Sequence, residues 1–384
     1  MTPRERALAA LEHREPDRVP FDLGGTGVSG IHQLAYRRLV AHLGVEVPPV
    51  RLRDVITQQA QVDEPVLRRL GADFRLVDMF SRGSVPDLGE EDGHHFFYDD
   101  FGIKWAMPKA GGLYFDMRSH PLAGPITLAD VAALRLPPPP DRERLREVRD
   151  SLRAAGIGER YPLTLAAPGG AGIFELASWI RGFNDFYVDL AVRPQLAEAL
   201  LDRLTEFKVE GWGRLLEELG DLAVVALEAD DLATQQRPLI SPGMYRKLVQ
   251  PRHRELFGFI KQHAPGRVYV FIHSCGSVYD LIADLVDAGV DILNPVQVNA
   301  ARMDTRALKR EFGDQLVFWG GGVDTQRVLP HGTPDQVRDE VRRRLEDLAP
   351  GGGFVFATVH NIQADVPPEN VAAMWEALQE YGWY

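Results

Sequence analysis

The sequence predicts an α/β protein with a (β/α)8 TIM barrel. Two observations carry this prediction. Eight short apolar runs rich in β-branched residues recur along the chain, and helix-period stretches lie between most of them. Strands that alternate with helices pair in parallel, and eight such units favour a barrel over a doubly wound sheet.

The predicted strands and helices alternate along most of the chain. Two helices begin with clear start signals, because Thr333 precedes Pro334 and Asp365 precedes the pair Pro367 and Pro368. The helix-period stretches are clearest at residues 185–211, 277–288, 333–348 and 368–381. The predicted strands are residues 19–23, 73–77, 163–166, 223–228, 268–272, 290–293, 316–319 and 354–357.

One interval, residues 89–122, interrupts the alternation. Aromatic residues alternate on both sides of the Gly111–Gly112 turn, which indicates a β-hairpin insertion at about residues 93–119. The run of prolines at 137–140 is a stiff connector on the surface. Because a barrel cannot close before that run, we expect a single domain over residues 1–384.

Composition describes an ordinary globular protein with an acidic surface. The 384 residues are 45% hydrophobic and 26% charged, with a formal net charge of −12. No basic stripe with interleaved aromatic residues is present, so we expect no nucleic-acid partner. The single cysteine excludes an internal disulfide, and no signal-peptide pattern or long apolar run is visible. We therefore expect a cytoplasmic protein without a membrane segment.

The strand predicted at 268–272 leads into His273 and Cys275. Side chains alternate along a strand, so residues two apart point the same way. An imidazole nitrogen and a thiolate sulfur on one face are favourable ligands for Zn²⁺. For this pair alone, the alternative remains a buried cysteine beside a hydrogen-bonded histidine.

His360 follows the last predicted strand and therefore lies on the same rim of the barrel. Together with His273 and Cys275 it makes three nitrogen or sulfur ligands, which leaves one position open, as a catalytic zinc requires. The alternative is a histidine in an ordinary loop or at a helix cap.

Acidic residues follow other predicted strands. Glu228, Asp230 or Asp231, after the fourth strand, could complete the zinc shell or orient a ligand imidazole, and we single out Glu228 and Asp231 as catalytic candidates. Asp22, after the first strand, and Asp54 are candidates for acid–base chemistry, although surface acids are common.

Amides follow the sixth strand, where Asn294 and Gln297 precede and follow Pro295. Because ligands of a barrel bind at the carboxyl ends of its strands, we expect Asn294, Gln297 and Asp54 to contact substrate. The glycines at 24, 25 and 27 either let a ligand approach the backbone or form a plain turn.

At this point the chain resembles the uroporphyrinogen decarboxylase superfamily, almost from end to end. The superfamily has a distorted (β/α)8 barrel, like that of the UroD/MetE-like folds, which agrees with the strand count. The motifs that carry the resemblance are Thr2–Arg6, Glu15–Pro20, Ile240–Pro242 with Tyr245, His273–Gly276, Gly289–Asp291, Gly320–Asp324 and Pro367–Asn370.

The resemblance is closer to the methyltransferase branch than to true uroporphyrinogen decarboxylases. The decarboxylases carry Arg-Gln-Ala-Gly-Arg after the first strand, whereas this chain has Phe21–Thr26 without arginine. A substrate with many carboxylates needs cationic partners. In the thiol-methylating members a second cysteine lies nine residues before the glutamate of Pro-Glu-Asn, and here His360 stands at that place before Glu369.

The resemblance implies a zinc-dependent methyltransferase that moves a methyl group between a small methylated substrate or thiol and a corrinoid (cobalamin) carried by a partner protein. The zinc would be held by His273, Cys275 and His360. The alternative is a cofactor-free decarboxylase of the haem and tetrapyrrole pathway, in which Asp22 or Asp54 stabilises a cation. A third is a corrinoid- or tetrapyrrole-binding protein without turnover. Superfamily members are often homodimers, which extends to this chain by analogy.

Overall fold

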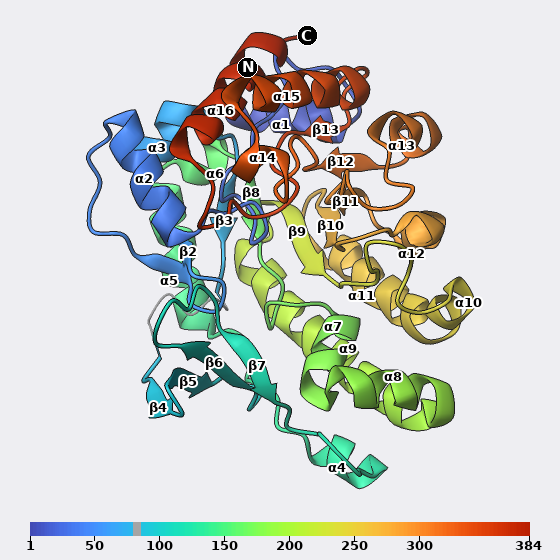
Figure 1. Cartoon of the computed structure of the whole chain (residues 1–384). Helices are drawn as coiled ribbons and strands as arrows, with labels where there is room; N and C mark the ends of the chain where they lie inside the picture. The colour runs from blue at the N-terminus through green and yellow to red at the C-terminus, as the bar shows by residue number, and fades with distance from the viewer. Residues whose placement is uncertain (80–85) are drawn as a thin grey trace.

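A computed structural model of the chain describes residues 1–79 and 86–384 (Figure 1). Its main sheet has the strand order β13-β12-β11-β10-β9-β8-β3, and every neighbouring pair is parallel. All the strands of this main sheet fall within or directly beside the predicted runs. They are β3 Arg75–Val77, β8 Leu163–Leu165, β9 Ala223–Ala229, β10 Tyr269–His273, β11 Ile292–Asn294, β12 Val317–Trp319 and β13 Phe354–Val355.

The first predicted strand, residues 19–23, closes the barrel between β13 and β3. Phe21 forms a parallel bridge with Phe356. On that side the Asp22 N–H donates to the Phe356 carbonyl at 2.9 Å, and on the other side the Asp73 N–H donates to the Phe21 carbonyl at 2.8 Å. The predicted eight-stranded barrel is therefore confirmed, with one strand held by few ladder bonds.

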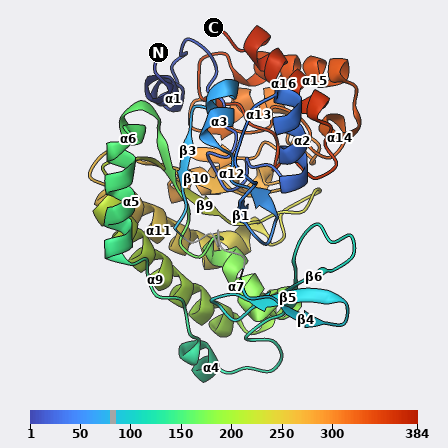
Figure 2. The same cartoon turned by 90° about the vertical axis from the view of Figure 1, so that its left-hand side faces the viewer.

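Helices pack around this barrel (Figures 1 and 2). The larger ones are α1 Pro3–Leu11, α2 Gln33–Leu43, α5 Arg142–Ala154, α7 Ile173–Arg181, α8 Phe183–Val192, α9 Pro194–Leu219, α11 Gln250–His263, α13 Thr305–Phe312, α15 Pro334–Leu348 and α16 Pro368–Tyr381. The shorter ones are α3 Glu64–Leu70, α4 Leu128–Ala133, α6 Ile157–Arg160, α10 Pro242–Met244, α12 Ile282–Ala288 and α14 Val328–His331, with a π-helix at Tyr245–Val249 and a 3₁₀ turn at Tyr279–Leu281.

Two of the predicted helical stretches differ in the structure. In the stretch 277–288, α12 begins only at Ile282, after a 3₁₀ turn at Tyr279–Leu281. The stretch 185–211 is divided, because α8 ends at Val192 and α9 begins at Pro194. A proline disfavours the helical conformation in the residue before it, and Arg193 accordingly has φ −134° and ψ 55°. The predicted start of α15 is as expected, since Thr333 and Gln336 form a capping box.

Alternate residues of the strands separate two apolar regions. Phe74, Leu227, Phe271 and Trp319 belong to one buried cluster, the filling of the barrel. Residues one position away, such as Ile272, belong to a larger cluster between the strands and the helices. This alternation follows from the period of two along a strand. It also decides which polar side chains can reach the mouth of the barrel.

The predicted hairpin is part of a four-stranded antiparallel sheet inserted after β3. Its strands are β4 Gly89–Glu91, β5 His94–Tyr98, β6 Lys104–Pro108 and β7 Asp116–Ser119, in the order β4-β5-β6-β7. Figures 1 and 2 show it on the side of the molecule opposite the two termini. Trp105 anchors it, because its ring packs edge-on against Trp179 of α7 with 5.6 Å between centroids. A separate two-stranded sheet is formed by β1 Leu52–Asp54 and β2 Gln59–Ala60.

None of the described helices is both long enough and apolar enough to cross a membrane.

Candidate metal centre

The structure brings the three predicted ligands together. One ligand atom each of His273, Cys275 and His360 lies within 4.8 Å of the others. Cys275 Sγ is 3.3 Å from His273 Nε2, and the two imidazole rings meet edge to face with 5.3 Å between centroids. Ligand atoms around a tetrahedral zinc lie roughly 3.5 Å apart, so this arrangement is close to what zinc requires.

Local backbone geometry explains why the histidine and cysteine converge. His273 is the last residue of β10, and Cys275 keeps the same facing two residues later. Gly276 then turns the chain with φ +91°, a conformation that favours glycine. A Cβ atom at Gly276 would lie 2.4 Å from the Thr234 carbonyl, so no larger residue fits.

Two neighbours hold the backbone on either side of this turn. The Asp231 carboxylate accepts the Cys275 N–H at 2.8 Å, and its Oδ1 lies 3.9 Å from His273 Nε2. Gln297, which we expected to contact substrate, accepts the Gly276 N–H at 2.6 Å through Oε1. Both side chains therefore position the cysteine, and Asp231 lies beside the ligand atoms.

The electrostatics of the cluster suit a metal cation. Burial raises the pKa of the Cys275 thiol well above its usual range, and the charges of Asp231 and Glu175 raise it further. Burial, with a smaller contribution from His273, lowers the pKa of His360 to about 3. His360 is thus neutral at physiological pH with a lone pair to donate, whereas the thiol needs a cation beside it to ionise. Two imidazoles and one thiolate are a donor set that fits Zn²⁺.

Glu228, which we singled out as a catalytic candidate, faces away from the three ligand residues. It lies on the outer side of β9, where it pairs in register with Ile272. Its Oε2 accepts Lys208 Nζ at 2.7 Å and its Oε1 accepts Trp212 Nε1 at 2.6 Å, and Glu228 and both α9 residues are buried. Burial raises the pKa of Glu228 in opposition to Lys208. The alternation of side chains along β9 turns Glu228 toward α9 and away from the ligand cluster.

Asp22 is buried beside the apolar side chains that fill the barrel. It is 1% exposed, and its carboxylate accepts the Gly25 N–H at 2.7 Å and Trp319 Nε1–H at 2.9 Å. Burial raises its pKa to about 6, although these donors and the nearby hydroxyls oppose the rise. Both carboxylate oxygens are engaged by the protein, so the observed geometry does not present Asp22 to a substrate.

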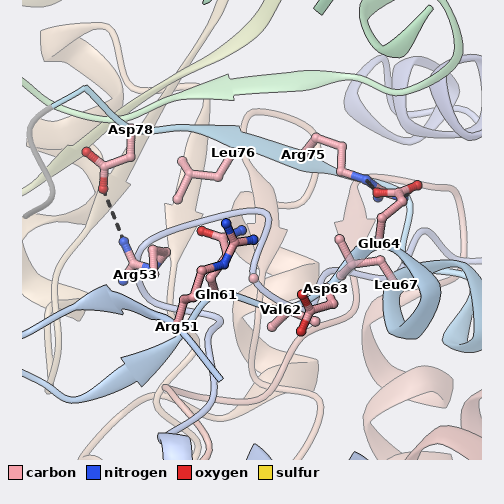
Figure 3. A pocket seen from close by; sticks show the side chains of 11 residues that line it. Arg51, Arg53, Gln61, Val62, Asp63, Glu64, Leu67, Arg75, Leu76 and Asp78 are labelled. Atoms are coloured by element: carbon pink, nitrogen blue, oxygen red, sulfur yellow. Dashed lines mark hydrogen bonds and ion pairs between the residues drawn. The ribbon is translucent and has the colours of Figure 1, made fainter. Parts of the chain in front are cut away.

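Asp54 lies in a turn at the end of β1. Its Oδ1 accepts the N–H groups of Ile56 and Thr57 at 2.7 and 3.1 Å. Close by is a cavity of about 300 Å³, in which Arg53 pairs with Asp78 at 3.1 Å (Figure 3). The described lining of this cavity comes from residues 51–67, residues 75–78 and Gly24, so it is separate from the three ligands.

Asp230, one of the acids named after the fourth strand, belongs to a further group of buried polar residues, whose other members His253 and Glu175 were not foreseen. Asp230 Oδ2 lies 2.7 Å from His253 Nε2, and His253 Nδ1 lies 2.9 Å from the Tyr245 hydroxyl. Asp230 Oδ1 accepts the N–H of Glu175 on α7 at 2.7 Å. Burial, followed by the charges of Asp231 and Asp230, raises the pKa of Glu175 well above its usual range. Glu175 is an ordinary helix residue in the sequence, with no motif to indicate this position.

Comparisons with known proteins agree with this architecture. A family model described as "Uroporphyrinogen decarboxylase (URO-D)" matches residues 100–381. A uroporphyrinogen decarboxylase of Pseudoalteromonas translucida is 29% identical over 178 residues; this match covers 44% of the chain and spans about half (48%) of that relative.

Other relatives match the whole chain. The methylcobamide:CoM methyltransferase MtaA of Methanosarcina barkeri is 24% identical and the match covers 99% of this chain and 98% of that protein. A solved structure described as a methyltransferase from Methanosarcina mazei superposes with a TM-score of 0.67 at 20% identity, covering 99% of both chains. At this identity the structural match supports the fold.

Proposed function

Because this chain belongs to the uroporphyrinogen decarboxylase family, we propose that it is a zinc-dependent methyltransferase acting with a corrinoid. It would move a methyl group between a small methylated substrate and a corrinoid carried by a partner protein. The full-length similarity to a methylcobamide:CoM methyltransferase supports this assignment. The observation that carries it is the convergence of His273, Cys275 and His360 at the barrel mouth.

The three side chains would hold the zinc, and the open fourth position would take the reacting atom. Bound there, zinc supplies Lewis acidity that polarises the bond to the transferred methyl group or activates the acceptor. Of these three side chains, Cys275 would contribute the single negative charge, since His273 and His360 would bind as neutral imidazoles. Asp231 and Gln297 hold the backbone in place by accepting the N–H groups of Cys275 and Gly276, respectively.

The identity of the three ligand residues also indicates which kind of substrate atom the site favours. A thiolate-rich shell is soft, whereas replacing a second cysteine with His360 makes the shell harder and leaves more positive charge on the metal. A harder, more electrophilic centre favours an oxygen or nitrogen atom at the open position. We therefore favour demethylation of a methyl ether or methylamine over methylation of a thiol.

The competing decarboxylase mechanism depends on Asp22 or Asp54. Asp54 uses its Oδ1 to accept the N–H groups of Ile56 and Thr57 in the turn after β1. The similarity to uroporphyrinogen decarboxylases keeps that activity in view. However, Asp22 is buried and accepts two hydrogen bonds from the protein itself. An acid that stabilises a substrate cation must reach the substrate, so the described geometry gives this mechanism less support.

Metal content tests the proposal directly. We expect about one zinc per purified chain, lost in Cys275→Ser and in His360→Ala, because each substitution removes one of only three protein ligands. His94→Ala, on the inserted sheet, is the matched control and should keep the metal. If the wild type and the two ligand variants are folded and equally free of zinc, the methyltransferase mechanism is wrong.

Activity then identifies the substrate class. The zinc-loaded protein is supplied with reduced cobalamin and, in parallel, a methyl ether, a methylamine and a methyl thioether, and formation of methylcobalamin is followed by absorbance. We expect turnover with the oxygen or nitrogen compound and none in Cys275→Ser. Release of carbon dioxide from a uroporphyrinogen in the presence of chelator would instead support the decarboxylase.

A further inference from the structure

The amide of Asn294 lies directly behind His273. Asn294 ends β11 and pairs in register with His273 at the end of β10. Asn294 is 1% exposed and His273 is 5% exposed. We expected Asn294 to contact substrate, but its side chain is enclosed between β10 and β12 rather than presented to solvent.

The orientation of this amide is determined by a backbone carbonyl. Asn294 Nδ2 donates to the Trp319 carbonyl at 2.8 Å. A carbonyl oxygen can only accept, so the NH₂ group must face Trp319 and Oδ1 must face the opposite way. The space for this arrangement depends on Gly320, because a Cβ atom there would lie 3.0 Å from Asn294 Nδ2.

The amide oxygen then selects one tautomer of His273. Asn294 Oδ1 lies 2.6 Å from His273 Nδ1. Because the amide oxygen only accepts, Nδ1 must carry the hydrogen and Nε2 is left with its lone pair. The position of Cys275 Sγ, 3.3 Å from Nε2, agrees, since the thiol can donate to that lone pair.

We propose that Asn294 is a positioning residue that holds His273 as the Nδ1–H tautomer and directs its Nε2 at the metal position. The chain Trp319 carbonyl, Asn294 amide and His273 ring links the ends of β12, β11 and β10. Hydrogen bonds to the second nitrogen of a ligand histidine fix the ring and strengthen its metal bond. The tautomer part stands on the protein alone, and only the metal part rests on the proposed function.

Three variants separate positioning from general support of the fold. Asn294→Leu keeps the shape of the side chain but removes the acceptor. Asn294→Asp restores an acceptor for His273 Nδ1–H. Asn370→Leu is the control, because Asn370 is also buried and donates to two backbone carbonyls, those of Leu329 and Gly332, neither of which belongs to a ligand residue.

The first measurement is the tautomer of His273 in the metal-free protein, from ¹⁵N-labelled histidine by NMR. We expect the Nδ1–H form in the wild type, in Asn294→Asp and in Asn370→Leu, and loss of this preference in Asn294→Leu. An Nε2–H form in the wild type, or an unchanged Nδ1–H form in Asn294→Leu, would overturn the proposal.

The second measurement is zinc affinity, by competition with a chromophoric chelator. Asn294→Leu should bind zinc about 10–100-fold more weakly than the wild type. Asn294→Asp should recover most of the loss, and Asn370→Leu should match the wild type. Equal affinity of Asn294→Leu and wild type would contradict the role in metal binding. If the wild type binds no zinc, the proposed function is wrong, and the NMR result still decides the role of Asn294.

Discussion

Two polar clusters lie on neighbouring strands of this barrel and have opposite characters. On the outer side of β9, Glu228 meets Lys208 and Trp212, and the side chains of Glu228 and Lys208 are 1% and 0% exposed. At the ends of β10 and β13, His273, Cys275 and His360 turn their ligand atoms toward one another. Ile272, the register partner of Glu228, directly precedes His273.

The two clusters differ in how far their polar atoms are already engaged by hydrogen bonds and ion pairs within the protein. Each oxygen of Glu228 accepts a hydrogen bond from α9, and the charge of Lys208 balances that of the carboxylate. In the other cluster, nitrogen and sulfur atoms of two histidines and one cysteine converge within 4.8 Å of one another. A saturated buried cluster supports the fold, whereas a cluster with converging lone pairs is suited to bind a metal.

The largest effect is expected from disrupting the cluster of Glu228, Lys208 and Trp212. Lys208→Met leaves the Glu228 carboxylate buried without its counter-ion, and loss of one partner of a buried pair costs about 3–5 kcal/mol. The free energy of unfolding should fall by this amount in urea titrations. Adding Glu228→Gln should restore part of it, and zinc content should not change in either variant. A loss below about 1 kcal/mol in Lys208→Met would contradict this account of the cluster.

A second effect concerns pH and Asp22. Burial raises the pKa of Asp22 from 3.8 to about 6, so the folded chain takes up this proton more readily than the unfolded chain. The contribution of Asp22 to stability therefore falls as the pH rises from about 4 to 6, by roughly 3 kcal/mol.

Asp22→Asn removes the titrating group, so the stability of the variant relative to the wild type should rise as the pH rises from about 4 to 6. Urea unfolding at several pH values, compared between wild type and variant, measures the difference in slope. Identical slopes would show that the folded environment does not favour the protonated carboxyl.

The smallest effect concerns the pKa of the Cys275 thiol in the cluster of His273, Cys275 and His360. Burial is the main cause of the raised pKa of Cys275, and the Asp231 charge adds to it. Asp231→Asn keeps an acceptor for the Cys275 N–H but removes the charge, so the pKa of the thiol should fall. The rate of alkylation of the metal-free protein, measured against pH, reports this directly because Cys275 is the single cysteine of the chain.

The control for this measurement is Asp54→Asn, because Asp54 lies in a turn of the β1–β2 sheet. It should leave the alkylation midpoint of Cys275 in place. A midpoint that stays constant in Asp231→Asn, or that moves to higher pH, would show that Asp231 does not act on the thiol.

The pattern of apolar residues and helix caps along the chain was sufficient to predict much of the fold. Seven of the eight apolar runs overlap the strands of the main sheet, because a strand buried on both faces needs a short continuous apolar segment, and the first run joins them through a parallel bridge. The helix over 333–348 was recognisable from its cap. The break at Arg193 was missed, since the apolar period continues through it while Pro194 starts a new helix. The start of α12 at Ile282, after a 3₁₀ turn, was also missed.

The sequence by itself determined that the chain is a barrel and that His273, Cys275 and His360 stand at strand ends on one rim. Side-chain alternation along a strand and the alternation of strands with helices can be read along the chain, and the second implies parallel pairing with all strand ends on one rim. Only the tertiary structure decided the roles of the polar residues around them. Asn294 faces the ring of His273 and Glu228 faces α9, because those partners come from distant segments that side-by-side strands and packed helices bring together.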